Sequence, residues 1–207
     1  MHGIRFIEWG GGFALRKLSN SQKIIAILWH TYLFFMKNTL LILALFCCTL
    51  LRAQTPEEKL LAAGYTLSSV GPPVANYVNV VRSGNLLFLA GKGPTQADGK
   101  YVTGKLGKDF TIEQGYAAAR LTALAQLSVL KDYLGNLSRV KRVVKVLGLV
   151  NGTEDFTDQP KVINGFSDMM VLVFGDKGKH ARSAIGVASL PFGMAVEVEL
   201  IVEVEND

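Results

Sequence analysis

Cysteine and histidine are almost absent from this chain beyond its N-terminal quarter. Both cysteines, Cys47 and Cys48, lie within the first 54 residues, and of three histidines only His180 lies beyond them. Histidine is the usual base of a catalytic triad and a usual ligand of zinc. A histidine-based triad and a multi-histidine metal site are therefore nearly excluded for residues 55–207, where no disulfide is needed either.

An excess of positive charge is also missing from residues 55–207. Six of the 22 lysines and arginines and one of the 17 acidic residues fall within residues 1–54, which leaves 16 of each sign beyond them. Because a nucleic-acid-binding surface needs clustered positive charge, no nucleic acid partner is expected. Four basic residues do alternate with valines, and a solvated strand face is favoured over an RNA site for them: Arg139, Lys141, Arg142 and Lys145.

The longest apolar run lies near the N-terminus and has the form of an export signal. Met36-Lys-Asn is a short basic start, residues 39–51 form an apolar block, and Ala53 is a small residue before a polar break. This pattern predicts a signal peptide over residues 36–54, cleaved near residue 54, and a periplasmic or secreted protein. The block is shorter than the roughly 20 residues of a spanning helix, so no stable membrane span is expected in the mature chain.

Residues 1–35 have two explanations. Translation that starts at Met36 instead of Met1 is favoured, because the signal pattern begins there. The alternative is a longer, membrane-anchored leader, since residues 24–51 are apolar apart from His30, Lys37, Asn38 and three threonines. In either case, residues 55–207 are expected to form one domain with its own core.

Residues 55–207 contain two helical segments and several short strand-like runs. Thr111 and Gln114 fit a capping box and Gly135 is a natural stop, which predicts a helix over 111–134. An apolar stripe predicts a second helix from about 157 to 174. The other expected elements are a short helix over 55–61, a hairpin of strands 77–81 and 86–90, a turn and strand over 137–150, and two strands, 183–187 and 195–204, joined by Leu190-Pro-Phe-Gly193. Two helices that cover one face of a mixed sheet make an α+β fold.

A lone arginine and a run of alternating carboxylates mark the C-terminal segment. Arg182 precedes a small, apolar run that has no other charge. Aliphatic and carboxylate residues alternate from 195 to 204, so Glu197 and Glu199 are predicted to share one face of a strand. Two interpretations of Arg182 stay open on these residues alone: an ion pair with one of the glutamates, or the binding of an external anion.

In order and spacing, these patterns resemble the RidA/YjgF/YER057c/UK114 family, also labelled endoribonuclease L-PSP. The resemblance covers roughly residues 60–207 and rests on two motifs: Gly84-Asn-Leu-Leu-Phe-Leu-Ala-Gly91, and Ala181-Arg-Ser-Ala-Ile-Gly-Val-Ala-Ser-Leu-Pro191 followed by Val196-Glu-Val-Glu199. It implies a chorismate-mutase-like α+β fold that assembles as a homotrimer, with ligand sites in the clefts between subunits.

The resemblance also implies an activity. Family members that have the arginine hydrolyse enamines and imines such as 2-aminoacrylate to a 2-keto acid and ammonia, without a cofactor, as 2-iminobutanoate/2-iminopropanoate deaminases. By this resemblance Arg182 binds the substrate carboxylate, a task that suits its permanently charged, two-pronged guanidinium. Glu197 positions or activates the hydrolytic water. Tyr77, Gly91 and Asn164 are the remaining substrate-binding residues that the resemblance implies.

Two positions depart from the family pattern. Ala184 stands where many deaminating members have a cysteine, and Lys92 follows Ala90-Gly91 where the family commonly has glutamine. The substrate therefore stays open, and so does a non-catalytic function as a trimeric module that binds small carboxylates. An endoribonuclease ranks lowest because a histidine pair and net positive charge are missing. His180 is interpreted as a surface or loop residue in preference to a base.

Overall fold

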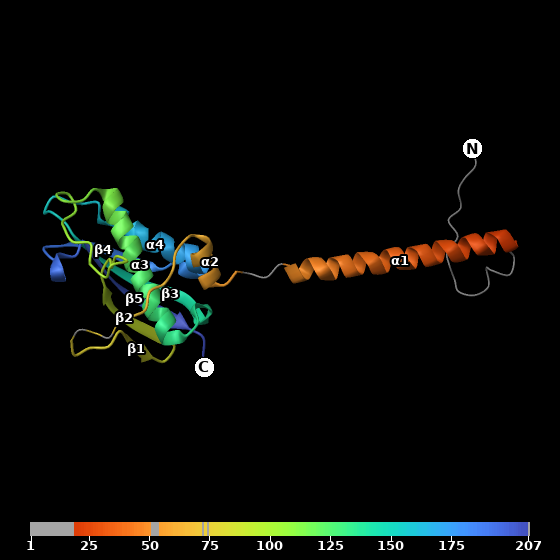
Figure 1. Cartoon of the computed structure of the whole chain (residues 1–207), viewed down its shortest axis with the longest axis horizontal. Coiled ribbons are helices and arrows are strands. Elements are labelled where there is room, and N and C mark those ends of the chain that lie inside the picture. The colour runs from red at the N-terminus through yellow and green to blue at the C-terminus, as the bar shows by residue number, and fades with distance from the viewer. Residues whose placement is uncertain (1–18, 51–53, 72, 74, 207) are drawn as a thin grey trace. The chain divides into compact units, whose positions relative to one another are not determined.

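The structure is a computed structural model that describes residues 19–50, 54–71, 73 and 75–206. Its internal contacts divide the chain into two compact units, Met1–Ala53 and Gln54–Asp207. The described part of the first unit is one helix, α1 (Asn20–Leu50), and the second unit contains all the strands that the structure describes (Figure 1).

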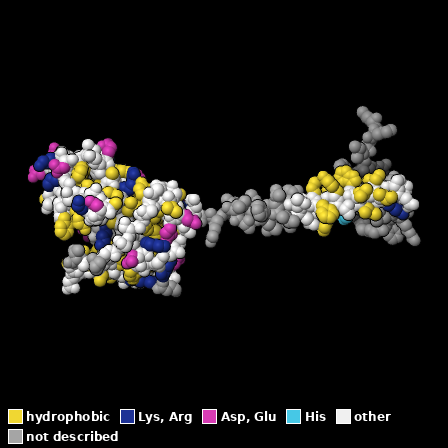
Figure 2. All heavy atoms as spheres, viewed as in Figure 1, with side chains coloured by type: hydrophobic (Ala, Val, Ile, Leu, Met, Phe, Trp, Pro, Cys, Tyr) yellow, Lys and Arg dark blue, Asp and Glu magenta, His cyan; other side chains and the backbone are white. Residues whose placement is uncertain are grey.

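Apolar side chains are exposed along the first half of α1, among them Ile24, Trp29 and Phe35 (Figure 2). Among the described residues, no helix combines the length and the hydropathy needed to cross a membrane. The predicted signal peptide begins within α1 and ends beyond it, partly in residues 51–53, which lie outside the described residues. Its cleavage, the exported location and the two explanations for residues 1–35 therefore stay predictions.

A five-stranded sheet with the order β1-β2-β5-β3-β4 forms the second unit. Neighbouring strands are antiparallel except β3 and β4, which are parallel because a helix carries the chain from one to the other. The two C-terminal strands are joined by the predicted turn but do not pair, because β3 lies between them. The strands are β1 (Val80–Ser83), β2 (Leu86–Lys92), β3 (Val140–Asn151), β4 (Ala181–Val187) and β5 (Val196–Val204).

Three helices accompany this sheet: α2 (Pro56–Ala62), α3 (Ile112–Leu134) and α4 (Gln159–Phe174). Capping boxes begin α2 at Thr55 and α3 at Thr111, and Gly135 ends α3 in the left-handed conformation, as predicted. Short 3-10 turns lie at Leu137–Arg139 (η2), Gly175–Gly178 (η3) and Pro191–Gly193 (η4). The predicted hairpin of residues 77–90 is present, but its first strand, β1, starts at Val80 and not at residue 77.

The helices α3 and α4 pack against one face of the sheet, and residues of β5 alternate between its two faces (Figure 1). Its aliphatic residues point into the core beneath the helices and are buried: Val196, Val198, Leu200, Val202 and Val204. The residues between them, which include Glu197 and Glu199, point to the opposite face, here called the open face. The predicted α+β arrangement, with two helices on one face of a mixed sheet, is confirmed.

A β-bulge interrupts the pairing of β2 with β5. Leu89 pairs with Leu200 and Lys92 with Val198, so two residues of β2 lie opposite one of β5. The fully buried Gln126 of α3 fills the gap, where its Nε2 donates hydrogen bonds to the carbonyl oxygens of Ala90 (2.9 Å) and Val198 (2.7 Å). The side-chain amide thus replaces the ladder hydrogen bonds that the bulge removes.

Close packing of α4 on α3 predicts that Gly165→Ala destabilises the protein. An added Cβ would overlap the backbone carbonyl of Tyr116, which cannot rotate away as a side chain can. Overpacking of this kind costs about 1–3 kcal/mol, and each kcal/mol lowers Tm by about 2–4 °C at this size. Thermal unfolding should show the loss in Gly165→Ala but not in Gly71→Ala, where a Cβ meets nothing within 4 Å. Equal Tm values for the two variants would contradict the described packing.

Candidate functional site

The predicted site residues form two groups on opposite faces of the sheet. Arg182 of β4 is in register with Val146, whose side chain is buried under the helices. Glu197 of β5 is in register with Leu149, which belongs to the open face. Because residues in register point to the same side of a sheet, Arg182 and Glu197 do not face a common cleft within one chain.

The first group, here called the arginine cluster, consists of Arg182, Asn164, Ser167 and His180. Arg182 Nη1 donates to Asn164 Oδ1 (2.9 Å) and to Ser167 Oγ (3.0 Å). Its Nη2 donates to the carbonyl of Pro160 (3.4 Å). The α-helix α4 presents Asn164 and Ser167 on one side because they are three residues apart. The structure thus joins Arg182 to the asparagine that the resemblance indicated.

All three hydrogen-bond acceptors of Arg182 are neutral. Within the described part of the chain, no carboxylate forms an ion pair with this guanidinium. The ion pair considered as an alternative, with Glu197 or Glu199, is not formed, since those side chains lie on the open face. The arginine is only partly buried, so its positive charge is available to an external anion.

His180 belongs to the arginine cluster through Ser167. Its Nδ1 lies 2.6 Å from the carbonyl oxygen of Gly178, and its Nε2 lies 3.1 Å from Ser167 Oγ. A carbonyl oxygen only accepts, so these partners assign the proton to Nδ1 and leave Nε2 to accept from the serine hydroxyl. Burial lowers the pKa of His180, and the charge of Arg182 lowers it further against the opposing effect of the Gly178 carbonyl, so the ring is neutral near pH 7.

The second group, here called the glutamate cluster, consists of Glu197 and Gly91. Burial raises the pKa of Glu197, and the neighbouring charge of Glu199 raises it further. Gly91 makes room for this carboxylate, because a Cβ at that position would overlap Glu197 Oε1. Lys92 follows Gly91 but is in register with Val198, and its Nζ donates to Asn79 Oδ1 (2.6 Å) while burial lowers the pKa of this lysine.

The predicted residues Gly91 and Glu197 are therefore in contact, and Tyr77 lies two residues before Asn79 with its side chain exposed. Ala184, at the position of the family's cysteine, shares the helix-facing side of β4 with Arg182 and packs against the core. Sequence reasoning missed Ser167 and assigned no chemistry to His180. A polar pair three residues apart, Asn164 and Ser167, was the available signal within the apolar stripe of α4.

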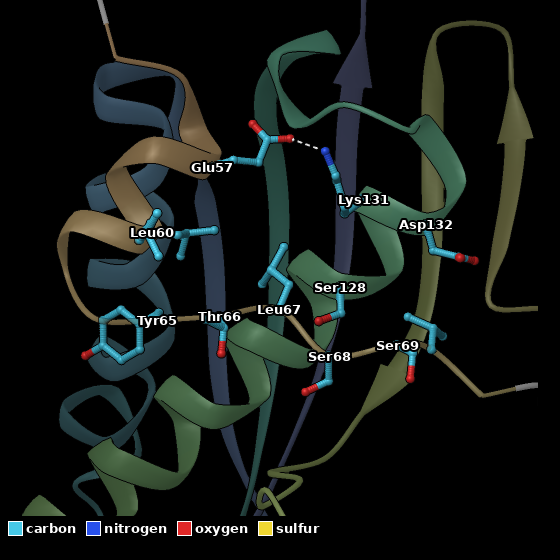
Figure 3. A pocket seen from close by; sticks show the side chains of 12 residues that line it. Glu57, Leu60, Tyr65, Thr66, Leu67, Ser68, Ser69, Ser128, Lys131 and Asp132 are labelled. Atoms are coloured by element: carbon cyan, nitrogen blue, oxygen red, sulfur yellow. Dashed lines mark hydrogen bonds and ion pairs between the residues drawn. The ribbon is translucent and has the colours of Figure 1, made fainter.

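Two hollows lie elsewhere in the second unit. One, of about 390 Å³, lies between α3 and the segment from α2 to Val70, and the Glu57–Lys131 ion pair (2.8 Å) borders it (Figure 3). The other, of about 720 Å³, opens where β3 and β4 end, and Gln159 and Gly186 are among its lining residues. Neither is lined by Arg182 or Glu197.

Charges on the second unit are mixed. Basic and acidic side chains are interspersed on the face that Figure 2 shows. Two of the four basic residues once weighed as an RNA site have partners within the sheet. Lys141 Nζ forms an ion pair with Glu203 (2.6 Å), and Lys145 Nζ donates to Ser183 Oγ (3.0 Å). These contacts favour the solvated strand face.

Comparison with known proteins gives several matches to this chain. A family model described as YjgF/chorismate mutase-like, putative endoribonuclease matches residues 57–204. Protein TCP17 of Trypanosoma cruzi is 47% identical over 144 residues, which are 69% of this chain and 90% of that protein. The crystal structure of a protein of unknown function from Agrobacterium tumefaciens is 41% identical with a TM-score of 0.68, covering 73% of this chain and 94% of that one. A putative endoribonuclease from Shewanella oneidensis MR-1 is 34% identical with a TM-score of 0.70, covering 73% and 100% respectively.

Proposed function

The chain belongs to the YjgF/chorismate mutase-like, putative endoribonuclease family, and we propose that it hydrolyses small imines or enamines that carry a carboxylate. The substrates resemble 2-aminoacrylate, and the products are a 2-keto acid and ammonia. The observation that carries this proposal is Arg182, whose guanidinium is partly exposed and, within the described residues, meets only neutral acceptors. Family membership also confirms the chorismate-mutase-like fold that the resemblance implied.

A substrate carboxylate on Arg182 would gain charge-assisted hydrogen bonds without breaking an ion pair. Asn164 and Ser167 hold the guanidinium in place beforehand, which lowers the entropy lost on binding. Hydrolysis then needs a water molecule to attack the carbon of the C=N bond and a proton to reach the nitrogen that leaves as ammonia. No cofactor enters this reaction.

Glu197 contributes to the same reaction only if a second copy of the chain is present, because it lies on the other face of the sheet from Arg182. A homotrimer is part of the proposal for this reason. The open face supports it, since three large apolar side chains are exposed on or beside that face: Val81, Phe88 and Ile185. Exposed apolar area of this kind is typical of surfaces that another chain covers.

The test is the release of ammonia and keto acid from freshly generated imino acids. The full chain, incubated with 2-aminoacrylate and with longer homologues, is expected to accelerate hydrolysis above the spontaneous rate. Buffer and heat-inactivated protein give the baseline. Release at the spontaneous rate for every member of the panel would refute the proposed activity.

A non-catalytic carboxylate-binding module is the alternative, and Ala184 favours it because the cysteine common in deaminating relatives is absent. Calorimetric binding of pyruvate or 2-oxobutanoate without any turnover of the corresponding imines would support the module.

An endoribonuclease remains the lowest-ranked candidate, despite the name of the family, because the charges of residues 55–207 are balanced. The exported location rests on the signal-peptide pattern of residues 36–54 and is proposed with it.

A further inference from the structure

Ser167 makes an unusual hydrogen bond for a serine inside a helix. Hydroxyl side chains within helices commonly donate to the carbonyl one turn earlier. Two residues of α3 do so: Thr122 donates to Ala118 O (3.1 Å) and Ser128 to Leu124 O (2.9 Å). The hydroxyl of Ser167 instead lies between Arg182 and His180. Its position therefore reflects the arginine cluster and not the helix.

The hydrogen bonds of this cluster run in one direction. Arg182 is a donor only, so Ser167 Oγ accepts from it and has its own proton left to give. That proton goes to His180 Nε2, and the opposite ring nitrogen donates to the Gly178 carbonyl. The result is a hydroxyl linked to a neutral, oriented imidazole, beside a cation that has no carboxylate among the described residues. A histidine held in one tautomer by a second hydrogen bond is suited to act as a base.

We infer that Ser167 and His180 form the proton-accepting pair of the site at Arg182. The inference rests on the proposed function, imine hydrolysis with the substrate carboxylate on Arg182. A water molecule that donates to Ser167 Oγ attacks the carbon of the C=N bond. As the new C–O bond forms, the water proton moves to Ser167 Oγ and the serine proton to His180 Nε2. The electron pair of the broken C=N π bond goes to nitrogen.

The proton then returns along the same path. The nitrogen of the carbinolamine takes up the proton that the imidazolium held. The C–N bond then breaks and ammonia leaves with its electron pair, while the C=O bond forms and the one remaining hydroxyl proton passes through Ser167 Oγ to the neutral His180 Nε2, which gives it to solvent. In the attack on a protonated imine the electron pair goes to nitrogen, so no oxygen anion develops at the carbon. Base and acid functions are sufficient, and one histidine supplies both.

Three charged residues close to Ser167 or His180 in the chain have partners of their own. Asp168 of α4 accepts from the Tyr116 hydroxyl (2.7 Å), and Asp176 of η3 pairs with Lys179, which follows η3 (2.7 Å). The charge of Arg182 is the one that acts on the imidazole, and it lowers the pKa of His180. A substrate carboxylate on Arg182 would offset that charge and make the imidazole a stronger base when substrate is bound.

The experiment measures kcat, KM and their pH dependence for the full chain and two variants, Ser167→Ala and His180→Gln. Each variant is expected to lower kcat by about 10²-fold with a smaller change in KM, as loss of a general base does. Wild-type kcat should fall as the pH drops through the lowered pKa of His180, because only the neutral ring accepts a proton. The variants should lack this acid limb. Ser128→Ala, a helical serine bonded to its own helix, is the matched control and should retain wild-type values.

A second measurement, of the tautomer and pKa of His180, does not require catalytic activity. In nuclear magnetic resonance titrations, the signals that His180→Gln removes identify the ring, its Nδ1–H tautomer and its pKa. Saturation with pyruvate is expected to raise that pKa in the wild type, and Arg182→Ala should abolish the rise. The opposite tautomer, or a pKa that pyruvate does not change, would overturn the inference.

The kinetic outcomes separate this inference from the proposed function. If the wild type hydrolyses imino acids and both variants keep its kcat and acid limb, the pair has no part in proton transfer and the inference is overturned while the proposed function stands. A change confined to KM would show that Ser167 only orients Arg182, which also overturns it. Absence of wild-type turnover would overturn the proposed function and the inference together.

Discussion

Replacing Arg182 by alanine is expected to lower kcat/KM for imino acid hydrolysis by about 10²- to 10³-fold. The guanidinium meets a substrate carboxylate through two charge-assisted hydrogen bonds, each of which contributes about 1.5–3 kcal/mol. Because the guanidinium is partly exposed, the two hydrogen bonds together are expected to contribute about 3–4 kcal/mol, near the lower end of this range. Each 1.4 kcal/mol corresponds to a factor of ten in kcat/KM. Asn164 and Ser167 would lose the donor that joins them, which also removes the orientation of the site.

Arg182→Lys separates the effect of the positive charge at this position from the effect of the guanidinium geometry. The charge remains, but an ammonium cannot replace a planar fork that simultaneously meets Asn164, Ser167 and a ligand. Arg182→Lys is therefore expected to bind pyruvate more weakly than the wild type and more tightly than Arg182→Ala, as measured by calorimetry. Arg142→Ala, at an exposed arginine of β3, is the control for loss of a positive charge alone. If Arg142→Ala and Arg182→Ala reduce kcat/KM equally, Arg182 has no special role.

Local patterns in the sequence predicted local structure well. The capping box at Thr111, the stop at Gly135 and the alternation of β5 each depend on residues within a few positions of one another, and all three appear as expected. The fold class followed from the same patterns, because two amphipathic helices and several short strands allow few layered arrangements. The family resemblance added the chorismate-mutase-like assignment.

Local patterns could not predict that Arg182 and Glu197 lie on opposite faces of the sheet. The alternation of side chains along one strand shows which of its residues share a face of the sheet. It cannot show which residues of β4 and β5 point to the same face, because β3 lies between these strands. The parallel crossover through α4 sets the face of Arg182, and that crossover is a long-range feature. Ser167 and His180 were missed for the same reason, since they are 13 positions apart and the turn η3 lies between them.

The bulge in β2 is the other feature that sequence did not predict, although it determines how Gly91 lies against Glu197. Gly91 lies within the unequal pairing between Leu89 and Lys92. Bulges next to functional sites re-aim side chains. Here the bulge depends on Gln126 of α3, which is 36 positions from Ala90 in the chain. The sequence offered no signal for this contact beyond a polar residue in an apolar helix.

Gln126→Leu is expected to destabilise the second unit by about 2–4 kcal/mol. The change leaves the carbonyls of Ala90 and Val198 buried without their donor, and each unpaired group costs about 1–3 kcal/mol. Part of the loss is offset because Gln126 Oε1 has no hydrogen-bond partner and disappears with the substitution. Denaturant unfolding of the full chain measures the difference, and Thr122→Val, a buried hydroxyl of the same helix, should lose less. Wild-type stability in Gln126→Leu would show that the amide is not what holds the bulge.

A carboxyl group at position 126, introduced by Gln126→Glu, is expected to make the loss of stability depend on pH. In Gln126→Glu the side chain keeps its size, but only its protonated form has a donor for either carbonyl, and it has one where the amide had two. Burial without a cation raises the pKa of the introduced carboxyl in the folded state. A group whose pKa is higher in the folded state contributes stability below its unfolded pKa, and this contribution is lost as the pH rises through the folded value. The gap in unfolding free energy between Gln126→Glu and the wild type should therefore widen from pH 4 to pH 8, whereas the gap for Gln126→Leu should stay constant. Parallel pH profiles for the two variants would place residue 126 in contact with water instead of against the two strand carbonyls.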